Sequence, residues 1–405
     1  MSVLFISPGY PAEMPFFVRG LARSGARVIG LGDQHSSQLP AMAREHLADH
    51  WQVGSLSDVG AITEAVRAGA RHAGITRIES LWEPTMLLAA HLRETLGIPG
   101  MGVEQTMLFR DKERMKQALD AAGVRTPRHV EATTADQVRE AAGRIGYPLI
   151  VKPIAGAGSA DTHRVDSPRE LESVLRRLLH VPSVSVEEFI DGDELTHDTI
   201  CARGRILVEN VCWYRPRPLV ARQLEWISPQ TVAVRALDVP FLDAGRALGR
   251  AVLDALEFRD GFTHMEWYRT AAGEAVFGEI GARPPGARTV DVMNYCTDSD
   301  LFERWAEAVL HGELRVPVER RYNAVSVFKR AQGQGRIQRI EGLGHLMAEY
   351  GEWVVALELL PVGAHRRDWL QTLTSDGMVI ARHPELHTML EIADRFGSEL
   401  QLYAG

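Results

Sequence analysis

Strand and helix signals alternate through the first hundred or so residues, and no other feature of the sequence limits the possible folds as strongly. Short apolar runs with the length of buried strands are followed by longer segments with the apolar spacing of helices. The expected strands are 3–7, 26–31 and 78–82, and the expected helices are 16–24, 61–73 and 86–96. Alternation of this kind is typical of βαβ units, so we expect a parallel, Rossmann-like sheet.

A glycine-containing segment in this region, GLGDQH at 30–35, raises the question of a dinucleotide site. His35 stands where the dinucleotide-binding fingerprint has its third glycine. We therefore expect the sheet without an NAD site.

Beyond about residue 106 the regular alternation gives way to a mixture of patterns. Helices are expected at 107–122, 135–145, 168–179, 242–256 and 301–310, and strands at 129–132, 148–153 and 184–190. Two further strands, 262–269 and 274–281, flank a turn and form an expected hairpin. We expect three parts in an α/β protein: an N-terminal parallel-sheet domain (1–105), a central domain (106–315) and a C-terminal α+β subdomain (316–405).

Composition and charge exclude several classes of protein. The 405 residues carry a net charge of −8 and no basic run interleaved with aromatics, so nucleic acid is not an expected partner. The 3 cysteines form no CxxC pair, which argues against a disulfide framework and suits a reducing compartment. The N-terminus lacks a basic region, and no apolar stretch approaches the roughly 18 residues of a membrane span. We expect a cytoplasmic protein with no membrane partner.

Lys152 is the first candidate for chemistry. It ends an apolar strand and precedes a loop of small residues, IAGAGSADT, which contains Gly156, Gly158 and Ser159. Backbone amides of such a loop can approach phosphate oxygens closely while the ammonium supplies positive charge. An ordinary strand-to-turn junction has the same pattern, and the GxxxxGK[ST] motif of a P-loop is absent from the sequence.

Acidic residues close the next expected strand. Glu187 and Glu188 stand together, and Glu194 follows after a short turn. A strand edge can hold an adenine through its backbone, while a carboxylate accepts protons from ribose hydroxyls. A solvated acidic edge would give the same pattern.

Glu266 and Glu279 stand in the two strands of the expected hairpin, among apolar and aromatic neighbours. Two carboxylates that converge can hold Mg²⁺, which prefers oxygen ligands. Arg283 follows in ARPPGAR, where a guanidinium can neutralise a transferring phosphoryl group or bind a carboxylate. The alternative is a charged strand face followed by a proline turn.

The order of these elements resembles the ATP-grasp superfamily. Asp111-Lys112 is followed by VKP with its small-residue loop, EEFI with Glu194, the hairpin carboxylates and Arg283, over about residues 106 to 315. The resemblance implies an ATP-grasp fold between two flanking domains. Within the superfamily the chain is most similar to carboxylate–amine ligases of the L-amino acid type, with biotin-carboxylase-like and purine-pathway members next.

The resemblance also assigns residues to ATP. Those that match phosphate ligands are Lys112, Lys152 and the covering loop with Gly156, Gly158 and Ser159. Those that match the adenine clamp are Glu187 and the backbone of Glu188 and Ile190, and Glu194 matches the ribose ligand.

The catalytic and metal residues follow from the same resemblance. Glu266 and Glu279 match the carboxylates that hold Mg²⁺, with Mn²⁺ as an alternative, and Arg283 matches the arginine that stabilises an acyl phosphate, together with Lys152. Members of the superfamily commonly place an Asn two residues after the second metal Glu, where this chain has Gly281. Glycine has no side-chain oxygen, so a second metal ion is in question.

The implied reaction uses ATP to activate a carboxylate as an acyl phosphate, which an amine converts to an amide with release of ADP and phosphate. The implied partners are small-molecule carboxylates and amines, and a homodimer is compatible with the resemblance. Two alternatives belong to other classes: a phosphotransferase that acts on a hydroxyl, and a non-catalytic ATP-binding regulator.

Overall fold

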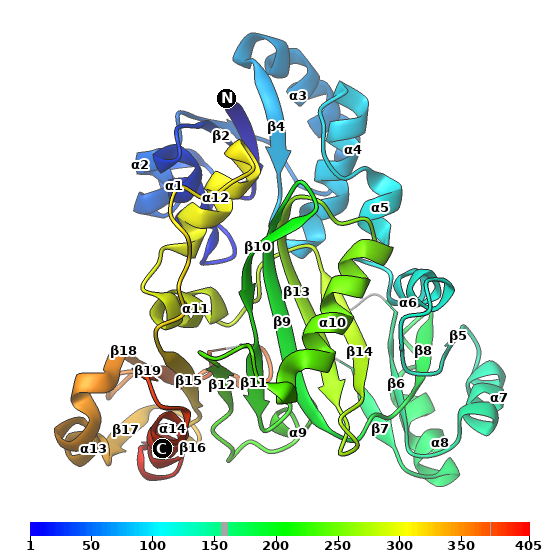
Figure 1. The fold of residues 1–405 in the computed structure, drawn as a ribbon, viewed down its shortest axis with the longest axis vertical. Helices are drawn as coiled ribbons and strands as arrows, with labels where there is room; N and C mark the ends of the chain where they lie inside the picture. The colour runs from blue at the N-terminus through cyan, green and yellow to red at the C-terminus, as the bar shows by residue number, and fades with distance from the viewer. Residues whose placement is uncertain (155–160, 373) are drawn as a thin grey trace.

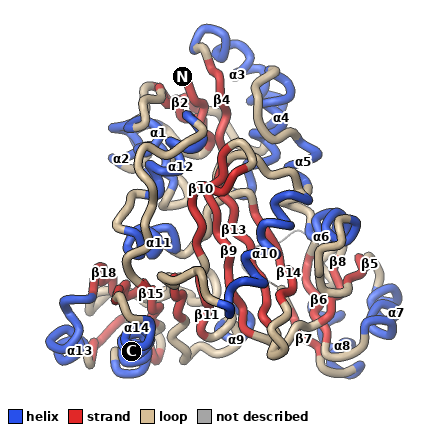
Figure 2. The backbone as a smooth tube through the Cα atoms, in the orientation of Figure 1, coloured by secondary structure: helices blue, strands red, loops and turns tan. Residues whose placement is uncertain are grey.

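The computed structural model describes residues 1–154, 161–372 and 374–405, and Figure 1 shows how they are arranged. Within these residues the strands form four sheets. The strands run through the middle of the molecule and most helices lie outside them (Figure 2).

The first sheet is parallel and has the strand order β3-β2-β1-β4. Its strands are β1 (Ser2–Ile6), β2 (Arg27–Gly32), β3 (Asp49–Gln52) and β4 (Ile75–Glu79). Its helices are α1 (Met14–Arg23), α2 (Ala41–His46), α3 (Val59–Ala73) and α4 (Met86–Leu96), with α5 (Val103–Met107) after them. The predicted Rossmann-like sheet is therefore confirmed. The carboxyl end of β4 points toward the centre of the molecule (Figure 1).

The second sheet is smaller, with the strand order β5-β8-β6-β7. Its strands are β5 (His129–Ala132), β6 (Leu149–Pro153), β7 (His163–Val165) and β8 (Val184–Glu188), and its helices are α6 (Lys112–Ala121), α7 (Ala135–Ile145) and α8 (Pro168–Arg177). Its pairings are antiparallel, and β6 and β8 set Ile150 opposite Glu187. Helix α6 is shorter than expected, because the Asp111 side chain accepts hydrogen bonds from the amides of Glu113 and Arg114 and so caps a new helix there.

The third sheet has nine strands in the described residues, and its main path is β14-β13-β9-β11-β12-β15-β19-β18. Its strands from the central region are β9 (Asp193–Ala202), β10 (Arg205–Asn210), β11 (Cys212–Arg215), β12 (Gln230–Ala233), β13 (Gly261–Arg269) and β14 (Ala275–Gly281). Its helices are α9 (Pro218–Ala221), α10 (Pro240–Ala255), α11 (Thr289–Thr297) and α12 (Leu301–His311). The predicted hairpin is present as β13 and β14, which pair antiparallel.

This third sheet crosses the boundary that we expect near residue 315. It continues through β15 (Asn323–Lys329), β18 (Val354–Leu359) and β19 (Gly377–His383). The fourth sheet consists of β16 (Gln332–Gly333), β17 (Ile337–Glu341) and β20 (Gln401–Ala404), near α13 (Leu343–Tyr350) and α14 (Leu386–Glu399). The C-terminal segment thus shares its main sheet with the central region, and the three-part division stays a prediction.

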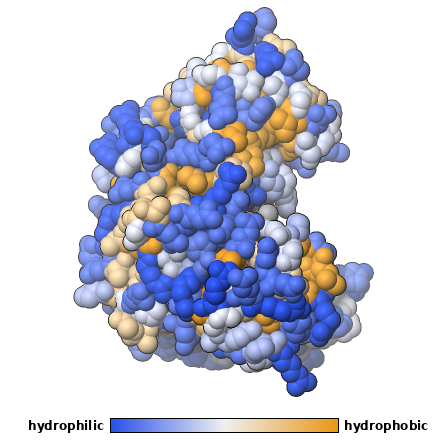
Figure 3. Space-filling view, turned by 90° about the vertical axis from the view of Figure 1, so that its right-hand side faces the viewer, coloured by the Kyte–Doolittle hydropathy of each residue, from blue (hydrophilic) through white to orange (hydrophobic). Residues whose placement is uncertain are grey.

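Two hydrophobic cores explain how a cleft can form. The second sheet has a core of its own, which includes Val138, Leu149, Leu171 and Val186. A much larger core lies under the third sheet and includes Trp267. Because these side chains pack within separate lobes, polar side chains from both lobes can face the space between them. The side of the molecule on which the second sheet lies is largely hydrophilic and is hollowed between its upper and lower parts (Figure 3).

Candidate active site

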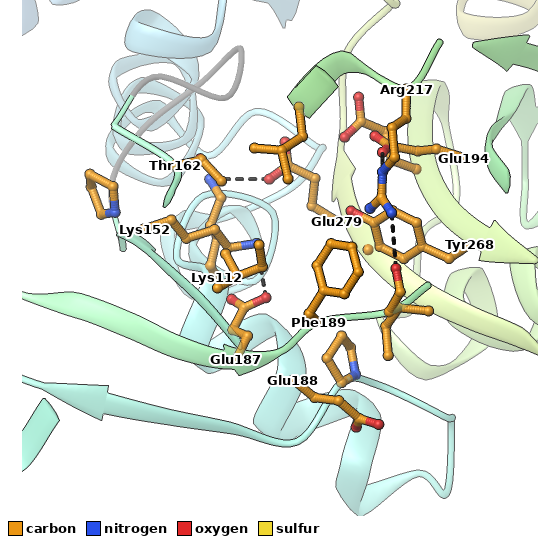
Figure 4. Close-up of a pocket in the computed structure, with 17 residues that line it drawn as sticks. Lys112, Lys152, Thr162, Glu187, Glu188, Phe189, Glu194, Arg217, Tyr268 and Glu279 are labelled. Atoms are coloured by element: carbon orange, nitrogen blue, oxygen red, sulfur yellow. Dashed lines mark hydrogen bonds and ion pairs between the residues drawn. The ribbon is translucent and has the colours of Figure 1, made fainter. Parts of the chain in front are cut away.

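A cleft between the second and third sheets brings most of the candidate residues together (Figure 4). The candidates that line it are Lys112, Lys152, Glu187, Glu188, Ile190, Glu194, Glu266 and Glu279. Arg283 lies at its border, next to Gly281. Gly156, Gly158 and Ser159 lie outside the described residues.

Lys112 is positioned by the start of helix α6. It is the first residue after the Asp111 cap, and it is buried. Its Nζ lies 3.3 Å from Oε2 of Glu279 on β14. Because Met115 and Leu119 of α6 pack in the core under the third sheet, this ion pair adds to the contact between α6 and β14.

Glu187 is held between two lysines. Its carboxylate contacts Nζ of Lys116 on α6, and its Oε2 lies 3.0 Å from Nζ of Lys152 on β6. Burial alone would favour the neutral acid, but the two ammonium groups hold the pKa of Glu187 well below its usual range. Burial likewise opposes the charge on Lys152, and Glu187 and Glu279 nevertheless raise the pKa of this lysine. Glu187 therefore stabilises the charged form of Lys152, and its carboxylate contacts lysines in this structure, whereas the resemblance assigns Glu187 to the adenine clamp.

Lys116 is a part of this cluster that the sequence interpretation missed. Only 1% of its side chain is exposed, and burial lowers its pKa to about 8 although Glu187 opposes this shift. The spacing in the sequence does indicate Lys116: it follows Lys112 by about one helical turn, so the two lysines lie on one face of α6.

Glu188 points away from the cleft. Its carboxylate accepts a hydrogen bond of 3.1 Å from the amide of Arg128 and lies 3.4 Å from Nη2 of Arg125. Burial raises the pKa of Glu188, but the amide of Arg128 and the guanidinium of Arg125 outweigh burial. The pKa therefore lies below its usual value. Only the backbone of Glu188 can therefore serve a ligand in the cleft, as the resemblance implies.

Glu194 occupies the opposite wall, at the start of β9. It is buried, and its Oε2 lies 3.2 Å from Nε of Arg217. Burial and the nearby Glu266 carboxylate raise the pKa of Glu194, although Arg217 acts in the opposite direction.

Glu266 and Glu279 face each other across the hairpin. They are directly opposed in the register of β13 and β14, and their side chains are 23% and 31% exposed. Burial disfavours the charge on Glu279, but Lys112, Lys152 and Arg283 hold its pKa at about 2. Two adjacent, accessible oxygen donors of this kind fit a divalent cation. Within the described part of the chain no group of three or more His, Cys, Asp or Glu side chains could hold a metal ion, so any cation here would need ligands from a bound molecule or water.

His264 supports the hairpin carboxylates from behind. Its Nδ1 lies 2.6 Å from Oδ1 of the buried Asp198, and its Nε2 lies 3.6 Å from Oε1 of Glu266. Burial lowers the pKa of His264, but Asp198 and Glu266 outweigh this effect and raise it to about 9. With its pKa raised in this way, His264 favours its charged form beside Glu266.

Arg283 is anchored from the N-terminal region. Its Nε lies 3.0 Å from Oε2 of Glu83, which also contacts Arg110. Gly281 has no unusual backbone conformation, but a Cβ on it would lie 3.2 Å from Cγ of Arg283. Glycine at this position therefore leaves room for the arginine. Glu83 was not among the sequence candidates, because no motif surrounds it.

Comparison with known proteins agrees with this geometry. Residues 109–213, which contribute Lys112, Lys152, Glu187 and Glu194, match the family model for an ATP-grasp domain. The chain contains an ATP-grasp domain. The resemblance drawn from the sequence is therefore confirmed, and the cleft described above is the one that this ATP-grasp domain forms with β13 and β14.

Relatives and solved structures extend the comparison beyond the ATP-grasp domain. An L-arginine-specific L-amino acid ligase of Bacillus subtilis is 28% identical over 294 residues, 71% of this chain and 70% of the relative. A D-alanine–D-alanine ligase of Pseudomonas putida is 36% identical over 119 residues, 29% of this chain and 37% of the relative. The crystal structure of an L-amino acid ligase from Bacillus licheniformis superposes with a TM-score of 0.80 at 20% identity, covering 100% of this chain and 98% of that one.

These comparisons confirm the predicted ATP-grasp fold, because the last of them covers the whole chain. The ATP-grasp superfamily binds ATP, and structures similar to this one have been solved with ADP. None of the helices in the described residues is long and apolar enough to cross a membrane.

Proposed function

We propose that this chain is an ATP-dependent ligase that joins a carboxylate to an amine through an acyl phosphate. One observation carries the proposal: two lysines, a buried carboxylate and a pair of opposed carboxylates converge on one cleft of an ATP-grasp domain. Positive charge for phosphates and oxygen ligands for a cation are the two requirements of phosphoryl transfer, and both are met within this cleft.

The chain's own residues would bind and orient ATP. Lys112 and Lys152 would contact the phosphates, with Glu187 and Lys116 fixing Lys152. The backbone around Glu188 and Ile190 would hold the adenine, and Glu194 would accept hydrogen bonds from the ribose. All of these residues except Lys116 line the cleft, and Figure 4 shows Lys112, Lys152, Glu187 and Glu194 in it.

The transfer can then be written in two steps. An oxygen of the substrate carboxylate attacks the γ-phosphorus, and the bond to the β–γ bridging oxygen breaks, so that ADP leaves. The amine nitrogen next attacks the acyl carbon, phosphate leaves with its oxygen, and the nitrogen loses a proton to give the amide. Lys152 and Arg283 would neutralise charge that develops on the phosphoryl oxygens.

Glu266 and Glu279 would hold the divalent cation, Mg²⁺ or in its place Mn²⁺. When bound, such a cation neutralises phosphate charge and orients the reacting oxygens. The two opposed carboxylates fit it, and Lys112 lies beside Glu279 with its Nζ 3.3 Å from Oε2.

We further propose small acids and amines of the amino-acid type as substrates, on the basis of the ligases that this chain resembles. Division into an N-terminal, a central and a C-terminal part, and assembly as a homodimer, remain predictions alongside this one.

The test is to incubate the protein with ATP, Mg²⁺ and pools of amino acids, and to follow phosphate release and product mass. A ligase releases phosphate only with the amino acids and yields a product with the mass of an amide. A stable phosphorylated pool member would instead identify a phosphotransferase, and neither product would indicate a regulator. Glu279→Gln, which keeps the size of the side chain but removes its charge, serves as the inactive control.

A further inference from the structure

Arg217 lies inside the proposed ATP site, although no sequence motif marked it. It follows β11 and immediately precedes helix α9. Its Nε lies 3.2 Å from Oε2 of Glu194, and its Nη1 donates a hydrogen bond of 3.0 Å to the carbonyl oxygen of Ile190 (Figure 4). The guanidinium thus binds two of the groups that we assign to ATP.

Two aromatic rings also contact the guanidinium of Arg217. Its guanidinium carbon lies 5.0 Å from the centre of the Phe189 ring and 4.9 Å from that of Tyr268. Phe189 follows β8 of the second sheet and Tyr268 lies on β13 of the third, so the arginine joins both walls of the cleft. Only 15% of its side chain is exposed.

The space that remains in the cleft is too small for a nucleotide. Its volume is about 70 Å³, whereas sites for ligands of this size commonly measure about 300–1,000 Å³. Arg217 holds the carbonyl of Ile190 and the carboxylate of Glu194, which are the groups expected to meet adenine and ribose. Nucleotide and guanidinium therefore compete for the same part of the cleft.

A second cavity offers space for the displaced side chain of Arg217. This cavity of about 460 Å³ adjoins the first, and Arg217 and Glu194 line both. It is also lined by Asp193, whose carboxylate can receive a guanidinium, and by Asp394, which is already paired with Arg215 and adds further negative charge. Rotation of the Arg217 side chain toward them would free the nucleotide cleft without moving either sheet.

We propose that Arg217 occupies the adenosine part of the ATP site while the protein is free of nucleotide, and turns into the neighbouring cavity when nucleotide binds. The proposal rests on the proposed function of the cleft. Since nucleotide binds only to molecules in which Arg217 has left, the measured dissociation constant exceeds the intrinsic one by the inverse of the open fraction. Arg217 therefore weakens nucleotide binding without being a catalytic residue.

The experiment compares Arg217→Ala with the wild type by calorimetric titration with ADP and, separately, with adenosine. The change acts on the free protein, so both ligands should bind more tightly by the same factor. The free Arg217→Ala protein lacks the ion pair and the two ring contacts that hold the arginine in the cleft. We therefore expect both dissociation constants to fall by a factor of roughly three to thirty. Arg222→Ala is the matched control: Arg222 lies five residues away, lines neither cavity and donates a hydrogen bond of 3.2 Å to the carbonyl oxygen of Leu370, so both affinities should stay at the wild-type value.

Other results overturn the proposal. Weaker binding of ADP with unchanged adenosine would make Arg217 a phosphate ligand, weaker binding of both would make it an adenine contact, and unchanged binding of both would remove any role. If neither ligand binds to any variant, the proposed nucleotide site itself is wrong. A crystal structure of the wild type with ADP decides independently, should Arg217→Ala not fold: the proposal requires that Arg217 no longer contacts Ile190 and Glu194.

Discussion

Glu187 shows why the sequence indicates single site residues but not the contacts between their side chains. The order of motifs assigned Lys152 and Glu187 to one site, and both side chains line one cleft. That they form an ion pair, and that Lys116 completes it from α6, depends on how the helix packs on the second sheet. The same holds for Arg217 and Glu83, which contact the assigned residues from segments without any motif.

Lys152→Ala should weaken ATP binding and lower turnover by at least about ten-fold while the protein still folds. The lost ammonium would face phosphate oxygens, and charge-assisted contacts of this kind are among the stronger ones in a protein. Titration with ATP and a phosphate-release assay measure the two effects. Arg144→Ala, on the exposed face of α7, provides a control for loss of one positive charge. Wild-type affinity and turnover in Lys152→Ala would rule out the phosphate assignment.

Gly281 permits a test of the metal site, because its backbone does not require glycine. Gly281→Asn would add a side-chain oxygen near Glu279, so half-maximal activity should be reached at a several-fold lower concentration of free Mg²⁺. The new Cβ would lie 3.2 Å from Cγ of Arg283, so the arginine has to shift by a few tenths of an ångström.

The matched control for this change is Gly281→Ala, which crowds Arg283 equally but adds no oxygen. Any loss of maximal turnover that comes from crowding Arg283 should appear in both variants, whereas the Mg²⁺ dependence of Gly281→Ala should stay at the wild-type position. An identical Mg²⁺ dependence in all three proteins would contradict the assignment of Glu266 and Glu279 as cation ligands.

At the scale of helices and strands, the sequence was most informative where apolar spacing was regular. Helices α4 and α7 have the predicted bounds, and the hairpin of β13 and β14 was found from its turn. Strand β3 was missed because its sequence, DHWQ, is polar and it lies half exposed at the sheet edge. Helix α11 was missed because it follows two non-glycine residues with positive φ, Ala287 and Arg288, which no sequence pattern indicates.

The contact between α6 and β5 should make stability depend on pH through His129. Its Nδ1 lies 3.0 Å from Oε2 of Glu113, and its Nε2 lies 3.0 Å from Oδ2 of Asp120. Burial opposes the charge on His129, but Glu113 outweighs it, so the pKa is raised in the folded protein. The stabilisation is then complete below the ordinary histidine pKa of about 6.5 and is lost as the pH rises through the folded value.

Urea unfolding of wild type and His129→Gln at several pH values measures this effect. The difference in free energy of unfolding should be largest near pH 5.5 and should shrink steadily above pH 6.5. A difference that stays constant up to pH 9 would mean that the histidine contributes packing rather than charge.

At the scale of the whole molecule, the sequence indicated the fold but not how its parts are joined. The N-terminal sheet and the third sheet share one hydrophobic core, in which Phe5 and Phe17 pack with Phe262, Phe302 and Trp305. Contacts between segments this far apart in the sequence leave no local pattern. They matter for the site, because Arg283, two residues after the end of β14, is anchored by Glu83 just beyond β4.

Helix α1 packs against α12 through Gly20, and this contact supplies the last prediction. A Cβ at Gly20 would lie 2.4 Å from the carbonyl oxygen of Phe302. Because that atom belongs to the backbone of α12, no side chain can move aside, and the two helices would have to separate. We expect Gly20→Ala to reduce the free energy of unfolding by roughly 1–3 kcal/mol, in spite of the better helix propensity of alanine.

Gly143→Ala isolates the propensity effect, because Gly143 also lies within a helix, α7, and a Cβ there would meet no atom within 4 Å. It should stabilise the protein by about 0.5–1 kcal/mol. Urea unfolding of both variants gives the two free energies, and ATP titration of Gly20→Ala shows whether loosening α1 from α12 reaches the cleft. If both variants gain stability equally, the contact between α1 and α12 tolerates a methyl group, and the shared core does not hold the N-terminal sheet at the spacing seen here.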